Sequence, residues 1–506
     1  MSAQIIPLPS DPTGINKPVS HSRKVDRSKP LTLRANFSWT AFGSVFYNFC
    51  QYSLFIVIAQ ITCSPEMAGQ YTIGLAVTAP IMIFFGSNLR AVIVSDVRRE
   101  CQIGGYMMFR VMSLVAAMSV IVTIVLCSDY AWETMLIILV VGVAKSIEGI
   151  SAILFGYFHQ NERMDQIAIS RVAKGILSIL YFAAGLWITG SILGGVCGLA
   201  LAWLTTLLFF DIPRAKALAT HRVLNRNVPM ERLWPVWNTK QLKKLFLLSL
   251  PISITVMLIC LNTNVPRYFV DFFKGQTVLG IFGPLSYFMV LGNEVVLALG
   301  QSATPRMARF YVHGERKEIV QLLLREKAVG VVFGLMGVAV AALVGRWALA
   351  VAFGPEYAQY SHVFLLLMIT SGITLVFGFS SMFLTAARAF WIQIPVRLCS
   401  LTAMTVSCWI FIPMYGIMGA AVAMLISATV HGVLAASAVT ILLLRMKDTA
   451  EKEATLPHTL AIQNVVAEVA PVTVAEPLSA CLPVVSPIVS PLGEVALEMP
   501  GGKITA

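Results

Sequence analysis

Charged side chains are scarce in this chain. Asp, Glu, Lys and Arg make up 12% of its 506 residues, while hydrophobic residues make up 57%. Soluble globular domains carry roughly 25% charged residues, and a helix that spans a bilayer needs about 20 mostly apolar residues in a row. The shortage of charge, together with long apolar runs, excludes an ordinary soluble protein and indicates one embedded in a membrane.

The sequence also lacks the usual signatures of metal, disulfide and nucleotide sites. Its nine cysteines show no paired spacing; Cys63 and Cys127 fall near the predicted outer face, where a bridge could form but is not indicated. The histidines of the predicted inner loops and helices stand apart from one another: His159, His221, His313 and His431. No P-loop or dinucleotide fingerprint occurs, which argues against an ATP-driven pump. We therefore expect neither a metal nor a cofactor.

What is present is a series of twelve hydrophobic segments, which predicts an all-α polytopic membrane protein because helices satisfy their own backbone inside a bilayer. The predicted transmembrane helices are residues 37–61, 71–94, 108–126, 135–158, 167–188, 192–210, 246–270, 278–302, 328–351, 363–387, 394–413 and 417–444. They divide the chain into a disordered N-terminal segment (1–36), an N-lobe (37–211), a basic cytoplasmic linker (212–245), a C-lobe (246–444) and a disordered cytoplasmic tail (445–506).

Basic residues mark one side of this topology. All but four of the 37 Lys and Arg residues fall on the predicted inner side; the exceptions are Lys145, Arg267, Lys274 and Arg346. Because inner loops of membrane proteins are enriched in Lys and Arg, this pattern predicts that both termini are cytoplasmic. The net charge of +12 is then a mark of topology and does not indicate nucleic-acid binding.

The two halves of the chain are weakly related. Aligning residues 69–71 with 280–282 pairs polar positions of the halves: Gln51 with Asn262, and Arg90 with Gln301. Parallel repeats of this kind typically flank a site that opens alternately to each side of the membrane. The predicted outside loops are short, whereas membrane glycosyltransferases and polymerases usually build an active site on a long one. We therefore expect a transporter and not an enzyme.

Charged residues inside the predicted helices carry the functional prediction, because each costs roughly 2.5–3.5 kcal/mol at a helix centre. Lys145 and Glu148 lie three residues apart on one helix face; they either neutralise each other structurally or act on substrate or protons. Glu294 has no neighbouring cation in the sequence and lies two turns from Gln301. We predict ion coupling for Glu294, with an interhelical hydrogen bond as the alternative.

Arginine and amide side chains form the predicted substrate-binding set. Arg267 breaks the inner-side pattern and shares a helix face with Asn264, with Asn262 close by. A guanidinium matches phosphate oxygens, so a cationic passage for an anionic cargo is expected. Gln51 is an uncharged candidate to touch sugar hydroxyls, and Gln301 is a further substrate-binding candidate. Three further arginines are candidates, with membrane anchoring as the ordinary interpretation: Arg90, Arg388 and Arg397.

Several short motifs resemble one known family. They are Phe155-Gly-Tyr-Phe-His-Gln-Asn-Glu-Arg-Met164, Leu250-Pro-Ile252, Asn262-Thr-Asn-Val-Pro-Arg-Tyr268, Leu279-Gly-Ile-Phe282, Gly300-Gln-Ser-Ala-Thr-Pro-Arg306 and Phe353-Gly-Pro-Glu-Tyr357. In these motifs and their positions, residues 37–444 resemble the Wzx-type polysaccharide (oligosaccharide-lipid) flippases. Their superfamily also contains the multidrug and toxin extruders and the lipid II flippases.

The resemblance implies two six-helix lobes in a V around a central cationic cavity. It implies a multi-pass protein of the bacterial inner membrane that flips undecaprenyl-diphosphate-linked oligosaccharides outward by alternating access, coupled to H⁺ or Na⁺. Polysaccharide polymerase and export components would be partners. It places one set of residues in the cavity: Gln51, Arg90, Asn262, Arg267 and Glu294. It assigns no role to Lys145 and Glu148.

Two other interpretations remain open at this point. A multidrug cation antiporter of the same fold would favour acidic residues in its cavity, whereas the candidates here are mostly basic and amide. A membrane scaffold for a polysaccharide synthase would need no buried charge, so Lys145, Glu148 and Glu294 argue against it.

Overall fold

A computed structural model describes residues 33–86, 89–96, 101–226, 233–387 and 389–455. The first half contains α1 (Leu33–Thr62), α2 (Pro65–Gly86), α3 (Leu89–Ser95), α4 (Ile103–Leu126), α5 (Trp132–Gln160), α6 (Met164–Thr189), α7 (Ile192–Thr206), the π-helix η1 (Leu207–Asp211) and α8 (Ile212–Arg226). The second half contains α9 (Thr239–Val312), α10 (Arg316–Phe353), α11 (Pro355–Ala358), α12 (Ser361–Ala386), α13 (Phe390–Tyr415) and α14 (Ile417–Thr455). The predicted all-α class is confirmed.

Ten of the described helices are long and apolar enough to cross a membrane, and a bent pair within α9 raises the number to eleven. Large apolar side chains point away from the bundles; Leu343 is 85% exposed and Trp187 is 79% exposed. Exposed apolar surface on this scale is typical of a membrane-embedded protein.

The predicted seventh and eighth spans are joined within α9. Gly275 interrupts the helix with φ 80° and ψ 176°, a backbone conformation that favours glycine. Across this break Arg267 Nη2 donates a hydrogen bond to Ser286 Oγ at 3.3 Å, so the two arms of α9 run back along each other. We call Thr239–Lys274 the first arm and the part after Gly275 the second arm.

Short turns connect helices at one end of the molecule, and local sequence explains where the helices stop there. Gly190 ends α6 in the left-handed conformation (φ 64°). The next residue, Ser191, accepts a hydrogen bond from the Leu193 amide and caps α7. We call this the short-turn end; it also holds Gly275, α11 and Gly416. The opposite, basic end holds α8, the start of α9 and the end of α14.

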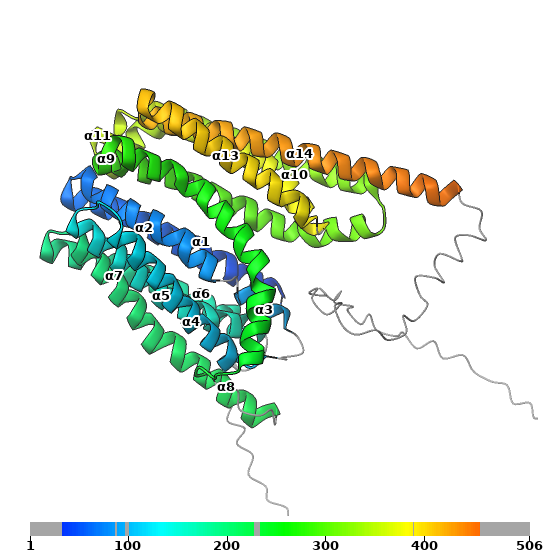
Figure 1. The fold of residues 1–506 in the computed structure, drawn as a ribbon, viewed down its shortest axis with the longest axis horizontal. Coiled ribbons are helices and arrows are strands. Elements are labelled where there is room, and N and C mark those ends of the chain that lie inside the picture. The colour runs from blue at the N-terminus through cyan, green and yellow to red at the C-terminus, as the bar shows by residue number, and fades with distance from the viewer. Residues whose placement is uncertain (1–32, 87–88, 97–100, 227–232, 388, 456–506) are drawn as a thin grey trace, which may run out of the picture.

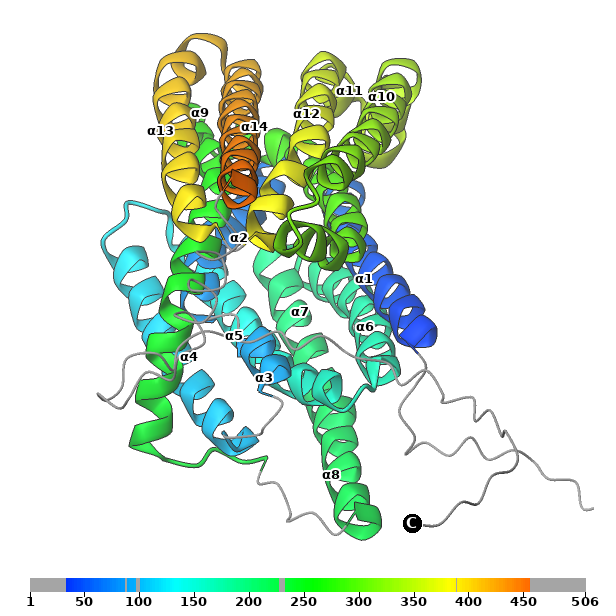
Figure 2. The same cartoon turned by 90° about the vertical axis from the view of Figure 1, so that its right-hand side faces the viewer.

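The helices form two lobes that meet at the short-turn end and separate toward the basic end (Figure 1). Helices α1–α7 form the N-lobe, and α9–α14 form the C-lobe above it in Figure 2, where α8 projects from the N-lobe. The first arm of α9 begins against the N-lobe, where the Val236 amide donates to the Gly104 carbonyl at 2.9 Å, and continues into the C-lobe.

Close backbone packing holds the lobes together at the short-turn end. A Cβ on Gly280 of α9 would lie 1.6 Å from the Pro65 carbonyl oxygen at the start of α2, so only glycine permits this approach. Nearby, Tyr130 Oη donates to Asp271 Oδ2 at 3.0 Å, and Gln60 Nε2 donates to the Val351 carbonyl at 3.0 Å. Small residues at a membrane helix interface allow this kind of contact.

One of the predicted regions needs correction. The predicted linker 212–245 contains α8 and, from Thr239, the start of α9; residues 227–232 lie outside the described residues. The predicted disordered tail is wrong for residues 445–455, which extend α14 to Thr455; the rest of the tail and residues 1–32 lie outside the described residues. Cys63 and Cys127 are both free thiols.

Candidate functional site

An ion pair lies on the side of the N-lobe that is turned toward the C-lobe. On α5, Lys145 Nζ contacts Glu148 Oε2 at 3.0 Å, and the two side chains are 28% and 30% exposed. Tyr47 Oη on α1 donates to Glu148 Oε1 at 2.8 Å. Glu148 thus uses both carboxylate oxygens while keeping part of its surface accessible. The sequence indicated the spacing of the charged pair but gave no sign of Tyr47.

A hydrogen-bond network ties this pair to Gln51. The Lys145 ammonium lies 4.9 Å from the centre of the Trp203 ring, a cation–π contact. Trp203 Nε1 donates to Ser178 Oγ at 2.9 Å, and Gln51 Nε2 donates to the same oxygen at 3.4 Å. Helices α1, α5, α6 and α7 therefore converge here. We call Tyr47, Gln51, Lys145, Glu148, Ser178 and Trp203 the N-lobe network.

Arg267 lies opposite, on the first arm of α9, and is only 7% exposed. Its Nη1 donates to Asn264 Oδ1 at 2.9 Å and its Nη2 to Ser286 Oγ. Asn264 in turn donates to the Cys260 carbonyl at 2.9 Å. The predicted sharing of a helix face by Asn264 and Arg267 is thus a direct hydrogen bond. The Arg267 Nε has no hydrogen-bond partner among the described residues.

The N-lobe network and the Arg267 region face one another. Lys145 lies within electrostatic range of Cys260 and of Tyr287 in the C-lobe, and Arg267 lies within range of the same two residues. Tyr287 also stacks on Tyr52 of α1, with ring centres 5.8 Å apart. On the short-turn side of these groups, an aromatic layer joins the lobes: Tyr52, Phe55, Tyr287, Phe288 and Phe353.

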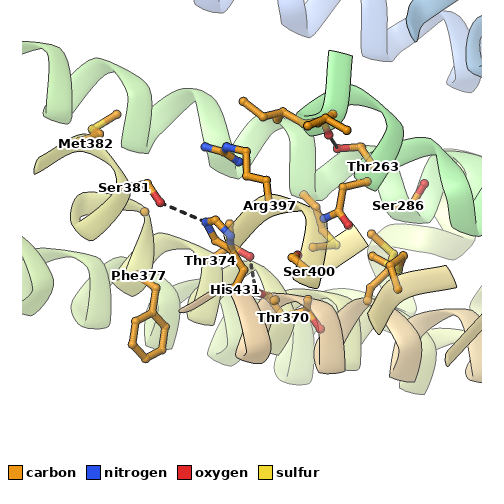
Figure 3. Close-up of a pocket in the computed structure, with 18 of the residues that line it drawn as sticks. Thr263, Ser286, Thr370, Thr374, Phe377, Ser381, Met382, Arg397, Ser400 and His431 are labelled. Carbon is orange, nitrogen blue, oxygen red and sulfur yellow. Dashed lines mark hydrogen bonds between the residues drawn. The ribbon is translucent and has the colours of Figure 1, made fainter. Parts of the chain in front are cut away.

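A cavity of about 390 Å³ lies within the C-lobe (Figure 3). Asn262 and Arg267 of α9 line it, together with Arg397 of α13 and His431 of α14. Asn262 Oδ1 accepts a hydrogen bond from Ser427 Oγ at 3.2 Å. We call this the C-lobe cavity. Asn262 therefore does not lie with Gln51, its counterpart in the predicted repeat, because it turns into its own lobe.

Arg397 and His431 were not recognised as partners from the sequence. His431 Nε2 lies 3.0 Å from Ser381 Oγ, and Figure 3 shows Arg397 on the same side of the cavity. The sequence held one signal, an arginine inside the first turns of an apolar segment, which is usually a membrane anchor. Arg388, the second arginine of that region, lies outside the described residues.

Arg90 occupies a different place. It lines a pocket of about 300 Å³ with Arg110 of α4 and Ser253 of the first arm of α9. Arg110 Nε donates to the Gly149 carbonyl at 3.1 Å. The structure therefore does not bring Arg90 into the C-lobe cavity with Arg267.

Two predicted site residues cannot be placed. Glu294 and Gln301 lie on the second arm of α9, in a stretch whose side chains lie outside the described residues. Ion coupling by Glu294 and substrate contact by Gln301 remain predictions. Within the part of the chain that the structure describes, no group of three or more His, Cys, Asp or Glu residues is placed to hold a metal ion.

A second N-lobe ion pair was missed. Lys174 of α6 and Asp211 of η1 are 2% and 0% exposed, and Lys174 Nζ lies 4.0 Å from Asp211 Oδ2. The two residues are far apart in the sequence, where Lys174 was interpreted as one more basic residue of the inner side. The π-helix that ends at Asp211 is a helix type often found at functional sites.

Comparison with known proteins assigns the family. Residues 33–311 match the family model described as polysaccharide biosynthesis protein. The chain belongs to this family. It is 24% identical over 400 residues to the capsular polysaccharide biosynthesis protein CapF of Staphylococcus aureus, covering 78% of this chain and 95% of that protein.

Solved structures share the fold of this polysaccharide biosynthesis family member. An inward-facing multidrug resistance MATE family transporter of the MOP superfamily matches with a TM-score of 0.65 at 14% identity, over 80% of this chain and 96% of that chain. The lipid II flippase MurJ in an inward closed conformation matches with a TM-score of 0.65 at 12% identity, over 85% and 96%. The chain is therefore a multi-pass membrane protein with a MOP-superfamily fold.

Proposed function

We propose that this protein is a flippase that moves undecaprenyl-diphosphate-linked oligosaccharides from the cytoplasmic to the periplasmic leaflet of a bacterial inner membrane. One observation carries the proposal. Two lobes are joined at the short-turn end and diverge toward the basic end, and the Lys145–Glu148 pair of one lobe and Arg267 of the other share Tyr287 and Cys260 as electrostatic neighbours. Membership of the polysaccharide biosynthesis family supports this cargo class.

The physical need for such a passage lies in the cargo. Each unpaired polar group in hydrocarbon costs several kcal/mol, so a diphosphate with attached sugars does not cross unaided. Between the lobes, Arg267 supplies positive charge, while Gln51 and Tyr47 supply hydrogen-bonding groups. The polyprenyl chain can stay in lipid while the head group passes.

The orientation and energy source are part of the proposal. Because basic residues mark the cytoplasmic side, the basic end and both termini face the cytoplasm, and the lobes open inward. Rocking of the two lobes then exposes the head group to the other side. We assign coupling to H⁺ or Na⁺ to Glu294, and we expect polymerase and export components as partners. The protein itself makes and breaks no bond.

The described residues favour an anionic cargo over the cationic cargo of a drug antiporter. A cation requires a carboxylate that is free to pair with it. Glu148 is already neutralised by Lys145 and hydrogen bonded to Tyr47, and Arg267 would repel a cation. The antiporter alternative therefore needs a carboxylate other than Glu148.

Polymer production in a strain lacking the gene tests the proposal. Wild type, Arg267→Ala and a control, Arg346→Ala, are expressed at matched levels; Arg346 is exposed on α10. We expect polymer output to be at least tenfold lower than wild type in the deletion strain and in Arg267→Ala. In the variant, a charge-assisted contact to the diphosphate is lost. Lipid-linked repeat units should accumulate on the inner leaflet. Normal polymer with loss of resistance to cationic drugs would contradict the flippase and favour the antiporter.

A further inference from the structure

Hydroxyl-bearing residues of α12 line the C-lobe cavity, with Phe377, Gly378 and Met382 between them. Thr370, Thr374, Ser381 and Thr385 line it at helical spacing, over roughly 22 Å of helix axis. Thr370 is fully buried and Thr385 is exposed toward the basic end. The cavity is therefore a cleft that runs from beside Arg267 toward the basic end of the C-lobe, with hydroxyl groups spaced along its α12 wall.

The described lining residues carry positive charge without a counter-charge. Arg267 and Arg397 line the cleft with His431, and none of the described lining residues is Asp or Glu. The Nε atoms of both arginines are buried and have no hydrogen-bond partner among the described residues. Burying unpaired polar groups is unfavourable, so these donors are placed for a ligand that accepts hydrogen bonds.

The chemistry of the lining selects the class of ligand. A guanidinium presents a planar set of donors that matches phosphate oxygens. The hydroxyls of Thr370, Thr374 and Thr385 donate to backbone carbonyls of α12, whereas Ser381 Oγ lies 3.0 Å from His431 Nε2. Figure 3 shows the Arg397 side chain near the Ser381–His431 pair, and all three residues line the cleft. The volume of about 390 Å³ falls within the range of small-molecule sites.

We propose that the C-lobe cavity is a binding site for a phosphate-type oxyanion, held by Arg397, Ser381 and His431, with Arg267 at its deep end. This site lies within the C-lobe and borders the passage between the lobes only at its deep end, where Arg267 belongs to both. Its anion has two sources, a polyprenyl diphosphate head group or a free phosphate. Assigning it to the head group rests on the proposed function, whereas the site itself does not.

Calorimetric titration of the purified full-length protein in detergent tests the site. The probes are inorganic phosphate, pyrophosphate and farnesyl diphosphate, a short polyprenyl diphosphate. Arg397→Gln removes the charge, Arg397→Lys keeps the charge but loses the planar donors, and Arg346→Gln is the matched arginine control on the surface of α10. Thermal unfolding of each variant establishes that it is folded, and Ser381→Ala replaces Arg397→Gln if that variant does not fold.

We expect wild type and Arg346→Gln to bind pyrophosphate equally and Arg397→Gln to bind it at least tenfold more weakly, with Arg397→Lys between them. If farnesyl diphosphate competes with pyrophosphate, the site is supported and its ligand is a polyprenyl diphosphate head group. If the free anions bind and farnesyl diphosphate does not compete with them, the site is supported and its ligand is free phosphate. Lost binding with normal polymer output would leave the site standing and separate it from transport. The proposal is overturned if wild type binds none of the three probes, or if Arg397→Gln and Ser381→Ala bind them as wild type does.

Discussion

The N-lobe contains two lysine–carboxylate pairs in very different surroundings. Lys174 and Asp211 are 2% and 0% exposed, at 4.0 Å, whereas Lys145 and Glu148 are 28% and 30% exposed, at 3.0 Å. The first pair is closed off inside one lobe. The second faces the other lobe, within electrostatic range of Tyr287 and Cys260.

The two pairs differ in burial, and we infer that they differ in role. Asp211 Oδ1 accepts a hydrogen bond from Ser170 at 2.5 Å, and Lys174 Nζ lies 5.2 Å from the centre of the Phe155 ring. This pair fixes α6 against η1, and losing one partner leaves a buried charge, which costs about 3–5 kcal/mol. The pair at Lys145 keeps access to water, so it contributes little to stability and is free to exchange partners when the lobes move.

The largest expected effect is on stability, from Asp211→Asn. We expect the free energy of unfolding to fall by about 3–5 kcal/mol, because the buried Lys174 loses its nearest counter-charge. Replacing both residues, Lys174→Met with Asp211→Leu, should recover most of the loss, since it removes both charges. Thermal and denaturant unfolding of the purified variants measure this. A loss below about 1 kcal/mol for Asp211→Asn would remove the distinction between the pairs.

We expect Glu148→Gln to change stability less than Asp211→Asn does, but to reduce transport strongly. The free energy of unfolding should change by about 1 kcal/mol or less, because the Lys145 side chain can still be hydrated. Polymer output should fall at least tenfold, because the unpaired lysine alters the charge between the lobes. Tyr47→Phe removes only the hydrogen bond to Glu148 and should reduce output less. Wild-type output from a stable Glu148→Gln protein would show that this pair, too, is structural.

Much of the architecture followed from the sequence because it depends on local composition. Runs of about 20 apolar residues predict spans, and the i,i+3 spacing of Lys145 and Glu148 predicts their contact, which the structure has at 3.0 Å. The same reasoning placed Arg267 beside Asn264. Segments seven and eight were predicted as separate helices, and they form the two arms of α9, which Gly275 separates by a turn without a loop.

The rest of the site depends on contacts between distant segments, which one sequence does not contain. Lys174 pairs with Asp211 across α6 and η1, and Arg397, His431 and Ser381 line one cavity from three different helices. In the sequence alone, Lys174 resembles an ordinary inner-side cation, Arg397 a membrane anchor and His431 an isolated histidine. Asn262, the repeat counterpart of Gln51, accepts a hydrogen bond from Ser427 of α14, a contact that the repeat alignment does not predict.

The central claim is that the lobes must part at the short-turn end for the cargo to leave. Gln60 and Val351 lie on opposite lobes, are both exposed, and are joined by the 3.0 Å hydrogen bond from Gln60 Nε2 to the Val351 carbonyl. In a background without native cysteines, Gln60→Cys with Val351→Cys can be joined by a short, reducible thiol crosslinker. Translocation of lipid-linked repeat units is then measured in sealed vesicles, with each single cysteine variant and a long-spacer crosslinker as controls.

We expect the short crosslink to stop translocation, a reductant to restore it, and the long spacer to permit it. Full translocation by protein that is completely crosslinked with the short spacer would contradict the account.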